Sequence, residues 1–284
     1  MTRKLLLGLI GAGIQRSMAP ILHEEEARQH GLRVHYQLID LDAAGLGVEA
    51  LPELVRAARA MGFAGLNITY PCKQAVIPLL DGLSDEARSI GAVNTVVRED
   101  QRFIGHNTDG SGWSWGLKRA LPGADLSFVV LLGAGGAGSA CADAVLRLGA
   151  KKLSVFDQDA ARAAALARRL NDAFGAARAE AGSDLPAAMK QATGFINATP
   201  MGMERSPGMP LGEDLLRPGL WVSDAVYVPL DTALLQAARR RGCATVDGGH
   251  MNVGQAVRAF KLFTGEEADA ERMELHFRSM SLPT

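Results

Sequence analysis

Three polar clusters stand in the first half of the chain, each at the end of a predicted strand. The first is 11–20 and contains Ser17, the second is 67–73, and the third extends over 94–110. They combine amides and hydroxyls, which bind polar ligands through hydrogen bonds, with one lysine and one carboxylate, which can exchange a proton. Because open α/β sheets bind ligands at the carboxyl ends of their strands, we expect these clusters to converge.

Each polar residue also has a purely structural interpretation. Ser17 and Asp109 could each cap the helix that follows, and Asn67 and Thr69 could satisfy the backbone of a turn. Lys73 could be a solvated side chain on a first helical turn, although that end of a helix disfavours a cation. The catalytic interpretation therefore depends on the clusters meeting beside a cofactor.

A glycine-rich loop, LLGAGGAGSA at 131–140, follows an apolar predicted strand and opens a predicted helix. Gly133, Gly135 and Gly138 have the G-x-G-x-x-G spacing of a dinucleotide-binding turn. The first permits a tight turn, the second lets the backbone approach a pyrophosphate, and the third allows close packing. The helix N-terminus favours phosphate. The alternative is a tight turn without a ligand. The predicted cofactor-binding loop consists of Gly133, Ala134, Gly135, Gly136, Ala137 and Gly138.

An acidic residue ends the next predicted strand. Asp157 stands 19 residues after Gly138, close to the position of the acid that binds the cofactor ribose. A carboxylate there accepts hydrogen bonds from ribose hydroxyls and repels a 2′-phosphate, so it favours NAD over NADP. Arg162 is interpreted as a solvated surface residue, and Asp159 as the N-cap of the alanine-rich helix that follows.

The composition is that of an ordinary globular chain. The 284 residues carry a net charge of −1, and 48% are hydrophobic. We expect neither a nucleic-acid nor a membrane partner, because there is no basic excess and no apolar run spans a bilayer. The run Leu5–Ile10 is too short for a signal-peptide core. Cys72, Cys141 and Cys243 lack metal-ligand spacing, so we expect no metal site and a cytoplasmic location.

Short apolar runs alternate with helical stretches, which predicts an α/β fold with mostly parallel sheets covered by helices. The predicted strands are Leu5–Ile10, Val34–Ile39, Gly65–Thr69, Ala92–Arg98, Ser127–Leu132, Lys152–Phe156, Gly194–Ala198, Trp221–Asp224 and Ala244–Asp247. The predicted helices are Pro20–His30, Glu49–Met61, Pro71–Leu80, Ser84–Ile90, Trp113–Ala120, Gly138–Leu148, Ala160–Phe174, Thr232–Arg241 and Asn252–Thr264. We expect two domains with a cleft between them: 1–111, completed by helices in 252–284, and a Rossmann-type domain, 112–251.

Six motifs resemble one enzyme family in the same order along the chain. Gly11–Pro20 resembles G-x-P-I-x-H-S-x-S-P, and Asn67–Lys73 matches N-[VI]-T-x-P-x-K. The others are G-A-V-N-T at Gly91–Thr95, N-T-D-x-x-G at Asn107–Gly112, N-A-T-x-x-G-M at Asn197–Met203 and G-x-x-M-x-x-x-Q-A at Gly248–Ala256. The chain thus resembles the shikimate/quinate dehydrogenase family.

The resemblance implies an enzyme that reversibly oxidises the C3 hydroxyl of shikimate, quinate or a close analogue, with hydride passing to NAD. It implies Lys73 and Asp109 as the catalytic pair. The residues implied to bind the substrate are Ser17, Asn67, Thr69, Asn94, Tyr227 and Gln255. Those implied to border the cofactor, besides the glycine loop and Asp157, are Asn197, Ala198, Thr199, Val226, Gly248 and Met251. We expect a monomer or a homodimer.

Some positions depart from the family pattern. Ala19 replaces the second carboxylate-binding hydroxyl, a loss of about 1.5–3 kcal/mol if nothing substitutes. Arg16 replaces a histidine, and His250 replaces a glycine. The natural substrate is therefore open, with an amino-substituted cyclohexene acid as an alternative. A second alternative is a non-catalytic sensor of NAD and a ring acid, which the intact Lys73 and Asp109 disfavour.

Overall fold

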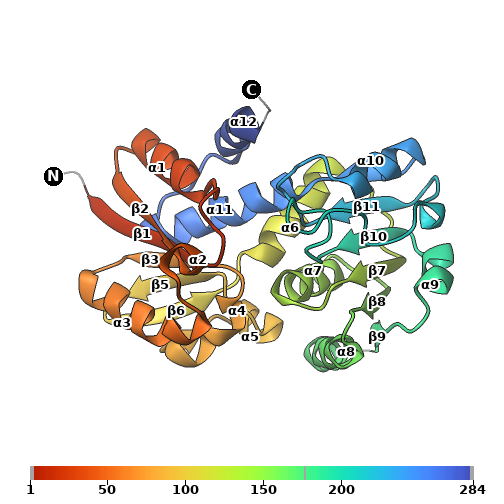
Figure 1. Cartoon of the computed structure of the whole chain (residues 1–284), viewed down its shortest axis with the longest axis horizontal. Coiled ribbons are helices and arrows are strands. Elements are labelled where there is room, and N and C mark those ends of the chain that lie inside the picture. Colours follow the sequence, from red (N-terminus) through yellow and green to blue (C-terminus); the bar gives the residue numbers. More distant parts are fainter. Residues whose placement is uncertain (1–2, 176, 282–284) are drawn as a thin grey trace. The chain divides into compact units, whose positions relative to one another are not determined.

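The computed structural model describes residues 3–175 and 177–281 (Figure 1). The chain divides into two compact units, Met1–Thr108 with Gln255–Thr284, and Asp109–Gly254. Each unit has its own six-stranded sheet, which confirms the predicted α/β class. Among the residues that the structure describes, no helix has the length and apolar character needed to cross a membrane.

The sheet of the first unit has the strand order β2-β1-β3-β5-β6-β4. Its strands are β1 (Lys4–Gly11), β2 (Arg33–Asp40), β3 (Gly65–Ile68), β4 (Gly82–Leu83), β5 (Thr95–Glu99) and β6 (Arg102–His106). The pairs β1–β2, β1–β3 and β4–β6 are parallel, whereas β5 runs antiparallel to both β3 and β6. A tight turn at Asp100, with φ of 54°, joins β5 to β6. The sheet is therefore mixed, with its parallel strands beside a hairpin.

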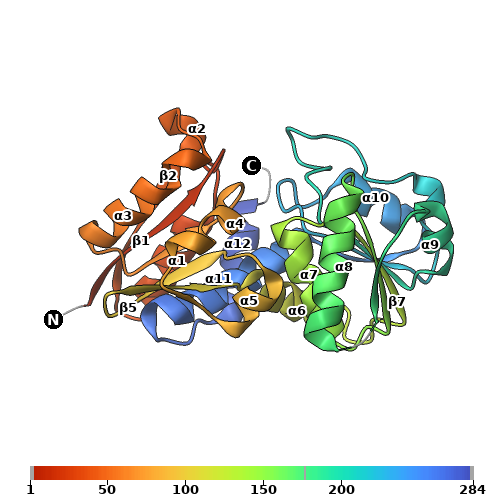
Figure 2. The same cartoon turned by 90° about the horizontal axis from the view of Figure 1, so that it is seen from below.

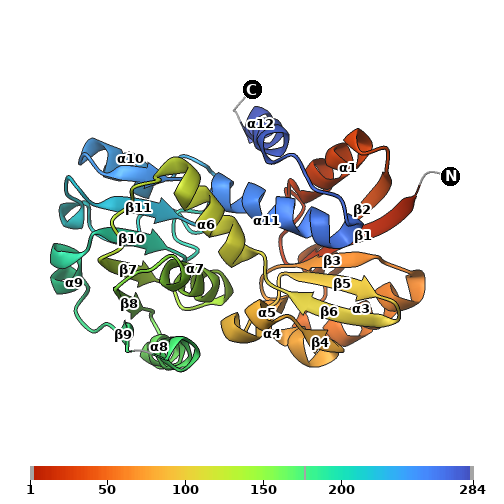
Figure 3. The ribbon, with the colours of Figure 1, turned by 180° about the vertical axis from the view of Figure 1, so that it is seen from behind.

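Helices cover both faces of this sheet. They are α1 (Ala19–Gln29), α2 (Leu41–Ala44), α3 (Leu51–Met61), α4 (Cys72–Ala75), α5 (Asp85–Ile90), α12 (Ala270–Ser281) and the later part of α11 (Gly248–Thr264), with 3-10 turns η1 (Val48–Ala50) and η2 (Ile77–Leu79). Buried residues of α3, α4 and α5 form one core with the sheet. On the other face α11 lies along the sheet (Figure 3). A Cβ at Gly65 would lie 2.3 Å from the Phe263 ring, so the glycine permits this close packing.

The C-terminal helix is fastened to α1 by a buried carboxylate. Glu26, 1% exposed, accepts hydrogen bonds from Arg272 at 2.6 and 2.9 Å and from the Asp269 backbone N–H at 2.8 Å. A buried carboxylate with a bidentate guanidinium partner is well compensated for its loss of water. Helix α12 therefore packs within the first unit.

The second unit contains an all-parallel sheet with the order β12-β11-β10-β7-β8-β9. Its strands are β7 (Phe128–Leu132), β8 (Lys152–Phe156), β9 (Ala179–Ala181), β10 (Gly194–Asn197), β11 (Trp221–Asp224) and β12 (Ala244–Val246). Its helices are α6 (Asp109–Ala120), α7 (Gly136–Arg147), α8 (Ala160–Phe174), α9 (Leu185–Gln191) and α10 (Ala233–Arg240), with a 3-10 turn η3 (Glu213–Leu215). Figure 2 shows α6, α7 and α8 on one face of the sheet and α9 and α10 on the other. This is a doubly wound arrangement.

The structure corrects the predicted start of one helix and one possible N-cap. Helix α6 begins at Asp109, not Trp113, although it contains Gly110 and Gly112. A Cβ at Gly110 would lie 3.1 Å from the Ala140 carbonyl oxygen, so packing against α7 explains this glycine in a helix. Ser17 does not occupy the N-cap of α1: Met18 stands there without a side-chain cap. Asp159 does cap α8, accepting from the Ala161 N–H.

Candidate functional site

Asn67 lies in a cross-strand row of polar side chains in the first unit. It stands opposite Thr95 on β5, which stands opposite His106 on β6. The Asn67 Nδ2 donates to Thr95 Oγ1 at 3.2 Å and to the Asn94 carbonyl at 3.3 Å, and its Oδ1 accepts from the Tyr36 hydroxyl at 2.7 Å. Asn67 is only 6% exposed, so these bonds fix its carboxamide.

Asn94 forms hydrogen bonds to Thr108, in the short segment between β6 and α6. Its Oδ1 accepts from the Thr108 backbone N–H at 2.7 Å, and its Nδ2 donates to Thr108 Oγ1 at 2.9 Å. Asn107 similarly donates to the Ala92 carbonyl at 3.0 Å. Asn107 and Thr108, the two residues before Asp109, are thus held by hydrogen bonds to the segment just before β5. The structure brings the second and third predicted clusters together through these contacts.

Lys73 is half-buried on the short helix α4. Its carbonyl oxygen accepts from the Val93 N–H at 2.8 Å, which ties α4 to the residues just before Asn94. Thr69, also half-buried, is fixed by its N–H to the Ile10 carbonyl at 2.9 Å. The short helix that carries Lys73 is therefore bonded to the segment just before β5, whose first residue, Thr95, stands opposite Asn67.

Asp109 is the first residue of α6 and is 5% exposed. A carboxylate in the first turn of a helix interacts favourably with its dipole. The negative charge of Asp109 acts on the half-buried Tyr227. Burial raises the pKa of the Tyr227 hydroxyl, and this charge raises it further. The second unit thus contains a carboxylate whose charge acts on a half-buried phenol. Gln255 is half-buried on α11, at the first position that belongs to the first unit.

Ser17 lies at the end of a loop that the strand β2 organises. Its hydroxyl accepts from the Ala19 N–H at 3.3 Å, so it contacts the first turn of α1 from outside the N-cap position. Ala19 itself offers only a methyl group. The structure therefore leaves one hydroxyl, not two, at this helix start.

Asp40 anchors the same loop from the end of β2. Its carboxylate accepts from the N–H groups of Gly13, Ile14 and Asp42 at 2.9, 3.0 and 3.1 Å, and from the Gln15 Nε2 at 3.0 Å. Burial works to raise the pKa of Asp40, but these hydrogen bonds outweigh it and hold the pKa below its usual value.

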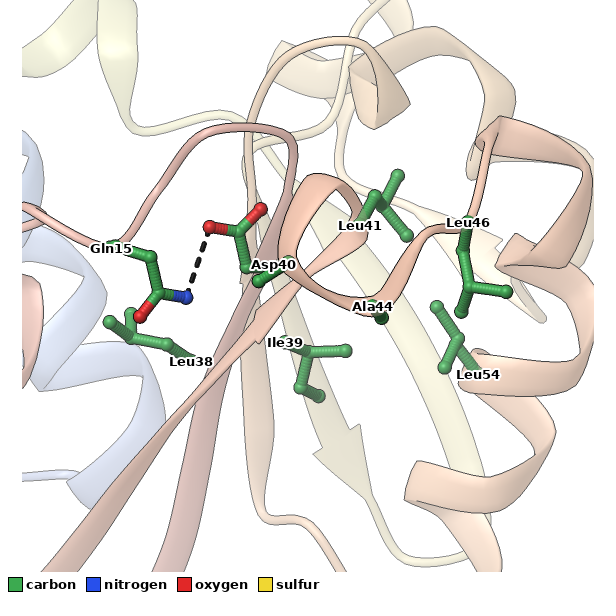
Figure 4. A pocket seen from close by; sticks show the side chains of 9 residues that line it. Gln15, Leu38, Ile39, Asp40, Leu41, Ala44, Leu46 and Leu54 are labelled. Carbon is green, nitrogen blue, oxygen red and sulfur yellow. Dashed lines mark hydrogen bonds between the residues drawn. The ribbon is translucent and has the colours of Figure 1, made fainter.

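A cavity of about 330 Å³ opens beside Asp40. Figure 4 shows the Gln15–Asp40 hydrogen bond at one side and the apolar side chains of Leu46 and Leu54 at the other. None of the residues predicted to bind substrate or cofactor lines this cavity. It is separate from the polar row around Asn67.

The glycine loop lies where the strand order of the second sheet reverses, between β7 and β10. Gly133 has φ of 103°, and a Cβ there would lie 2.8 Å from the Ala198 carbonyl oxygen. A Cβ at Gly138 would lie 1.8 Å from the Gly133 carbonyl oxygen, which agrees with the predicted packing role. A Cβ at Gly135, the N-cap of α7, would meet open space. Gly133 and Gly138 therefore leave no room for a side chain, whereas the space beside Gly135 is open.

Asp157 faces this loop from the end of β8. Its Oδ2 accepts from the Ala134 N–H at 2.7 Å, and its Oδ1 accepts from the Asp159 N–H at 2.9 Å. Arg162, by contrast, is 68% exposed in its side chain and lies 3.5 Å from Asp159. The acid therefore lies against the glycine loop, whereas the arginine is on the surface.

Asn197 and Asp224 form a buried polar pair that spans the ends of β10 and β11. The Asn197 Nδ2 donates to Asp224 Oδ1 at 2.9 Å, and Asn197 Oδ1 accepts from the Thr199 hydroxyl at 2.7 Å. Asp224 also accepts from the Val226 N–H at 3.0 Å and the Thr232 hydroxyl at 2.8 Å. Burial raises the pKa of Asp224 to about 6, because these hydrogen bonds only partly oppose it. Through these hydrogen bonds the pair fixes the conformation of the loops that follow β10 and β11.

The remaining predicted cofactor residues are packed closely. A Cβ at Gly248 would lie 2.4 Å from the Val226 carbonyl oxygen, and Met251 belongs to the hydrophobic core on the α6 side. His250 packs on α6, where a Cβ at Gly116 would lie 2.6 Å from its own Cβ. Glycines thus allow α11 to begin against both the sheet and α6.

Comparisons with known proteins identify the family of this chain. A family model, the shikimate dehydrogenase substrate binding domain, matches residues 9–96. A shikimate dehydrogenase (NADP(+)) of Streptomyces avermitilis is 57% identical over 94% of this chain and 93% of its own length. The chain belongs to the shikimate/quinate dehydrogenase family. It is an oxidoreductase of the alcohol dehydrogenase type.

Other relatives differ in cofactor. A quinate/shikimate dehydrogenase (NAD(+)) of Corynebacterium efficiens is 48% identical over 97% of this chain and 98% of its own. The solved quinate dehydrogenase of Corynebacterium glutamicum in complex with NAD has a TM-score of 0.91, with 45% identity over 98% of this chain and 100% of its own. Of these relatives, the one named for NADP(+) is the more similar in sequence, at 57% identity against 48% for the one named for NAD(+).

Residue patterns missed three members of the site region: Tyr36, Asp40 and Asp224. Each is a buried polar side chain on a strand whose partner is 25 or more residues away in sequence. A buried carboxylate at the end of a strand was the available signal for Asp40 and Asp224, whereas Tyr36 lies inside β2. Within the described part of the dehydrogenase, no group of three or more His, Cys, Asp or Glu residues is arranged to hold a metal ion.

Proposed function

We propose that this dehydrogenase reversibly oxidises the C3 hydroxyl of shikimate, quinate or a close analogue, with NAD as the cofactor. The observation that carries the cofactor choice is Asp157, whose carboxylate lies against the glycine loop through the Ala134 N–H at 2.7 Å. A carboxylate there accepts hydrogen bonds from two ribose hydroxyls and repels a 2′-phosphate. The NAD-named relatives support the same choice.

The second unit has the features that a dinucleotide needs. The open space beside Gly135 leaves room for a pyrophosphate, and the 12-residue helix α7 directs its first N–H groups there. The rest of the cofactor would lie along the other residues assigned to it, which are Asn197, Ala198, Thr199, Val226, Gly248 and Met251. NAD, when bound, supplies the acceptor for the hydride.

Lys73 and Asp109 act together on the substrate in this proposal. The Lys73 Nζ takes the proton of the C3 hydroxyl while the electron pair of the C3–H bond leaves as hydride, so a carbonyl forms at C3. In the reverse direction the ammonium returns the proton. Asp109 balances the charge on the lysine and orients it. Asp109 is held at the start of α6, so little conformational entropy is lost when its side chain is oriented toward bound substrate.

The other predicted side chains bind the ring. Asn67, Thr69, Asn94 and Gln255 bind the hydroxyl groups, while Ser17 and Tyr227 bind the carboxylate. Since Ala19 removes one hydroxyl from the carboxylate site, an amino-substituted analogue of shikimate is the second candidate substrate. That candidate has the same reaction centre and the same cofactor.

The test is kcat/KM for NAD and for NADP, measured with shikimate, quinate and an amino analogue. We expect at least about a tenfold preference for NAD, because a phosphate placed beside an uncompensated carboxylate is repelled. Asp157→Ser should remove most of that preference. The matched control is Asp159→Ser, which removes a neighbouring carboxylate that only caps α8. A wild-type enzyme that prefers NADP, or that turns over none of the three acids, would contradict the proposal.

A further inference from the structure

The hydrogen-bonding capacity of Asn67 is almost completely used inside the first unit. A carboxamide has two N–H donors and an oxygen with two lone pairs. Both donors are engaged, on the Asn94 carbonyl at 3.3 Å and on Thr95 Oγ1 at 3.2 Å. One lone pair accepts from the Tyr36 hydroxyl at 2.7 Å. What Asn67 can offer to a ligand is therefore the second lone pair of Oδ1.

Tyr36 is held firmly in the position that gives this result. The residue is 4% exposed on β2, and its ring stacks on His23 with centroids 5.1 Å apart and planes 15° from parallel. A reversed Asn67 carboxamide would place its oxygen against the Asn94 carbonyl, two acceptors facing each other. It would also place the Nδ2 donor where Oδ1 now accepts from the Tyr36 hydroxyl at 2.7 Å, so that two donors would face each other. Both errors cost free energy in a buried site.

We propose that Tyr36 is a positioning residue that fixes Asn67 as a hydrogen-bond acceptor toward the substrate. The dehydrogenase then selects, at this position, a ring substituent that donates a hydrogen bond. A hydroxyl or an amine fits, whereas a fluorine or an ether oxygen does not. The C3 oxygen loses its proton in the reaction, so the group that faces Asn67 is one of the hydroxyls that the reaction leaves unchanged. This inference rests on the proposed function, since it takes Asn67 as a substrate ligand.

The first test replaces the hydroxyl alone. Tyr36→Phe keeps the ring that stacks on His23, and it should raise KM for shikimate about 3- to 10-fold, the value of one hydrogen bond. The kcat should stay within about twofold and KM for NAD should not change, because Asn67 binds a group outside the reaction centre. In an Asn67→Ala background the same substitution should add nothing. Tyr70→Phe is the matched control, since that side chain is 71% exposed.

The results separate the two proposals. If Asn67→Ala raises KM for shikimate and Tyr36→Phe leaves it unchanged, the positioning role is overturned and the proposed function stands. If the wild-type enzyme neither binds nor oxidises shikimate, quinate or an amino analogue, both are overturned.

The second test needs no variant. Binding of shikimate analogues is compared after the C4 or C5 hydroxyl is replaced by fluorine or by an amine. At one of these carbons the fluoro analogue should bind about tenfold more weakly than shikimate, because fluorine cannot donate to Asn67. The amino analogue should bind within about threefold of shikimate at that carbon. Equal affinity of shikimate and both fluoro analogues would overturn the proposal.

Discussion

The imidazole of His23 on α1 is fully buried between aromatic rings, 5.1 Å from Tyr36 and 6.2 Å from Phe260 between centroids. Neither ring nitrogen has a hydrogen-bond partner among the described residues. Burial lowers the pKa of His23 to about 4, and the negative charge of Glu26 opposes this only in part. The ring is thus neutral near pH 7, where it supports Tyr36 as an apolar surface.

This burial makes stability depend on pH. Between pH 6.5 and about 4 the unfolded chain binds a proton on His23 that the folded chain does not, so stability falls as the pH falls. Protonation of His23 therefore does not lower the free energy of unfolding above pH 6.5, and it lowers that free energy by about 3 kcal/mol at pH 4. His23→Phe should remove this loss. Denaturant unfolding of both proteins from pH 7 to 4 measures it, and an identical pH dependence of the two would contradict the buried neutral ring.

Some site residues were predictable from sequence and others were not, for a physical reason. Gly133, Gly138 and Asp157 follow from one strand-turn-helix-strand segment, where spacing alone fixes the geometry. Tyr36 acts on Asn67, and Asp224 on Asn197, across strand pairings that only the folded sheet creates. The local pattern of a single strand carries no information about such a partner.

At the scale of elements, the long apolar strands and amphipathic helices were predicted well. Strand β8 and helix α8 have the predicted bounds. The predicted helix Pro71–Leu80 is broken into α4 and η2, and Pro78, which has no backbone N–H, lies in the second piece. Strand β6, absent from the prediction, ends at Gly105 and His106 and depends on β5 for its hydrogen bonds. Pairing with β5 therefore decided this strand, which the local pattern missed.

The glycine loop offers an element-scale prediction that separates folding from cofactor binding. Gly138→Ala should destabilise the second unit by about 1–3 kcal/mol, because its Cβ would lie 1.8 Å from the Gly133 carbonyl oxygen. Gly135→Ala should leave the midpoint of thermal unfolding nearly unchanged, since its Cβ meets open space. The same substitution should raise KM for NAD about tenfold or more, because that space is proposed to receive the pyrophosphate.

Thermal unfolding and KM for NAD are measured on both variants. Two equal losses of stability would show that the space beside Gly135 is not open. An unchanged KM for NAD in Gly135→Ala would place the cofactor elsewhere.

At the scale of the whole molecule, the chain crosses between its two units twice, after Thr108 and after Gly254. Both crossings fall at residues with a proposed role: Asp109 follows the first, and Gln255 follows the second. The resemblance to the dehydrogenase family implies that these residues serve one reaction, although they are separated by more than 100 positions. Composition and periodicity predicted two α/β series, but they carry no signal for which side chains act on the same atom.

The reaction itself is best tested at Lys73. The kcat for NADH formation from shikimate is measured for the wild-type enzyme and for Lys73→Met, which keeps most of the length of the side chain and removes the amine. Lys118→Met, at an exposed position on α6, is the control. A proton-transfer role predicts that Lys73→Met lowers kcat by about 10²- to 10⁴-fold while the control stays near wild type. A Lys73→Met enzyme with the kcat of the wild type would contradict it.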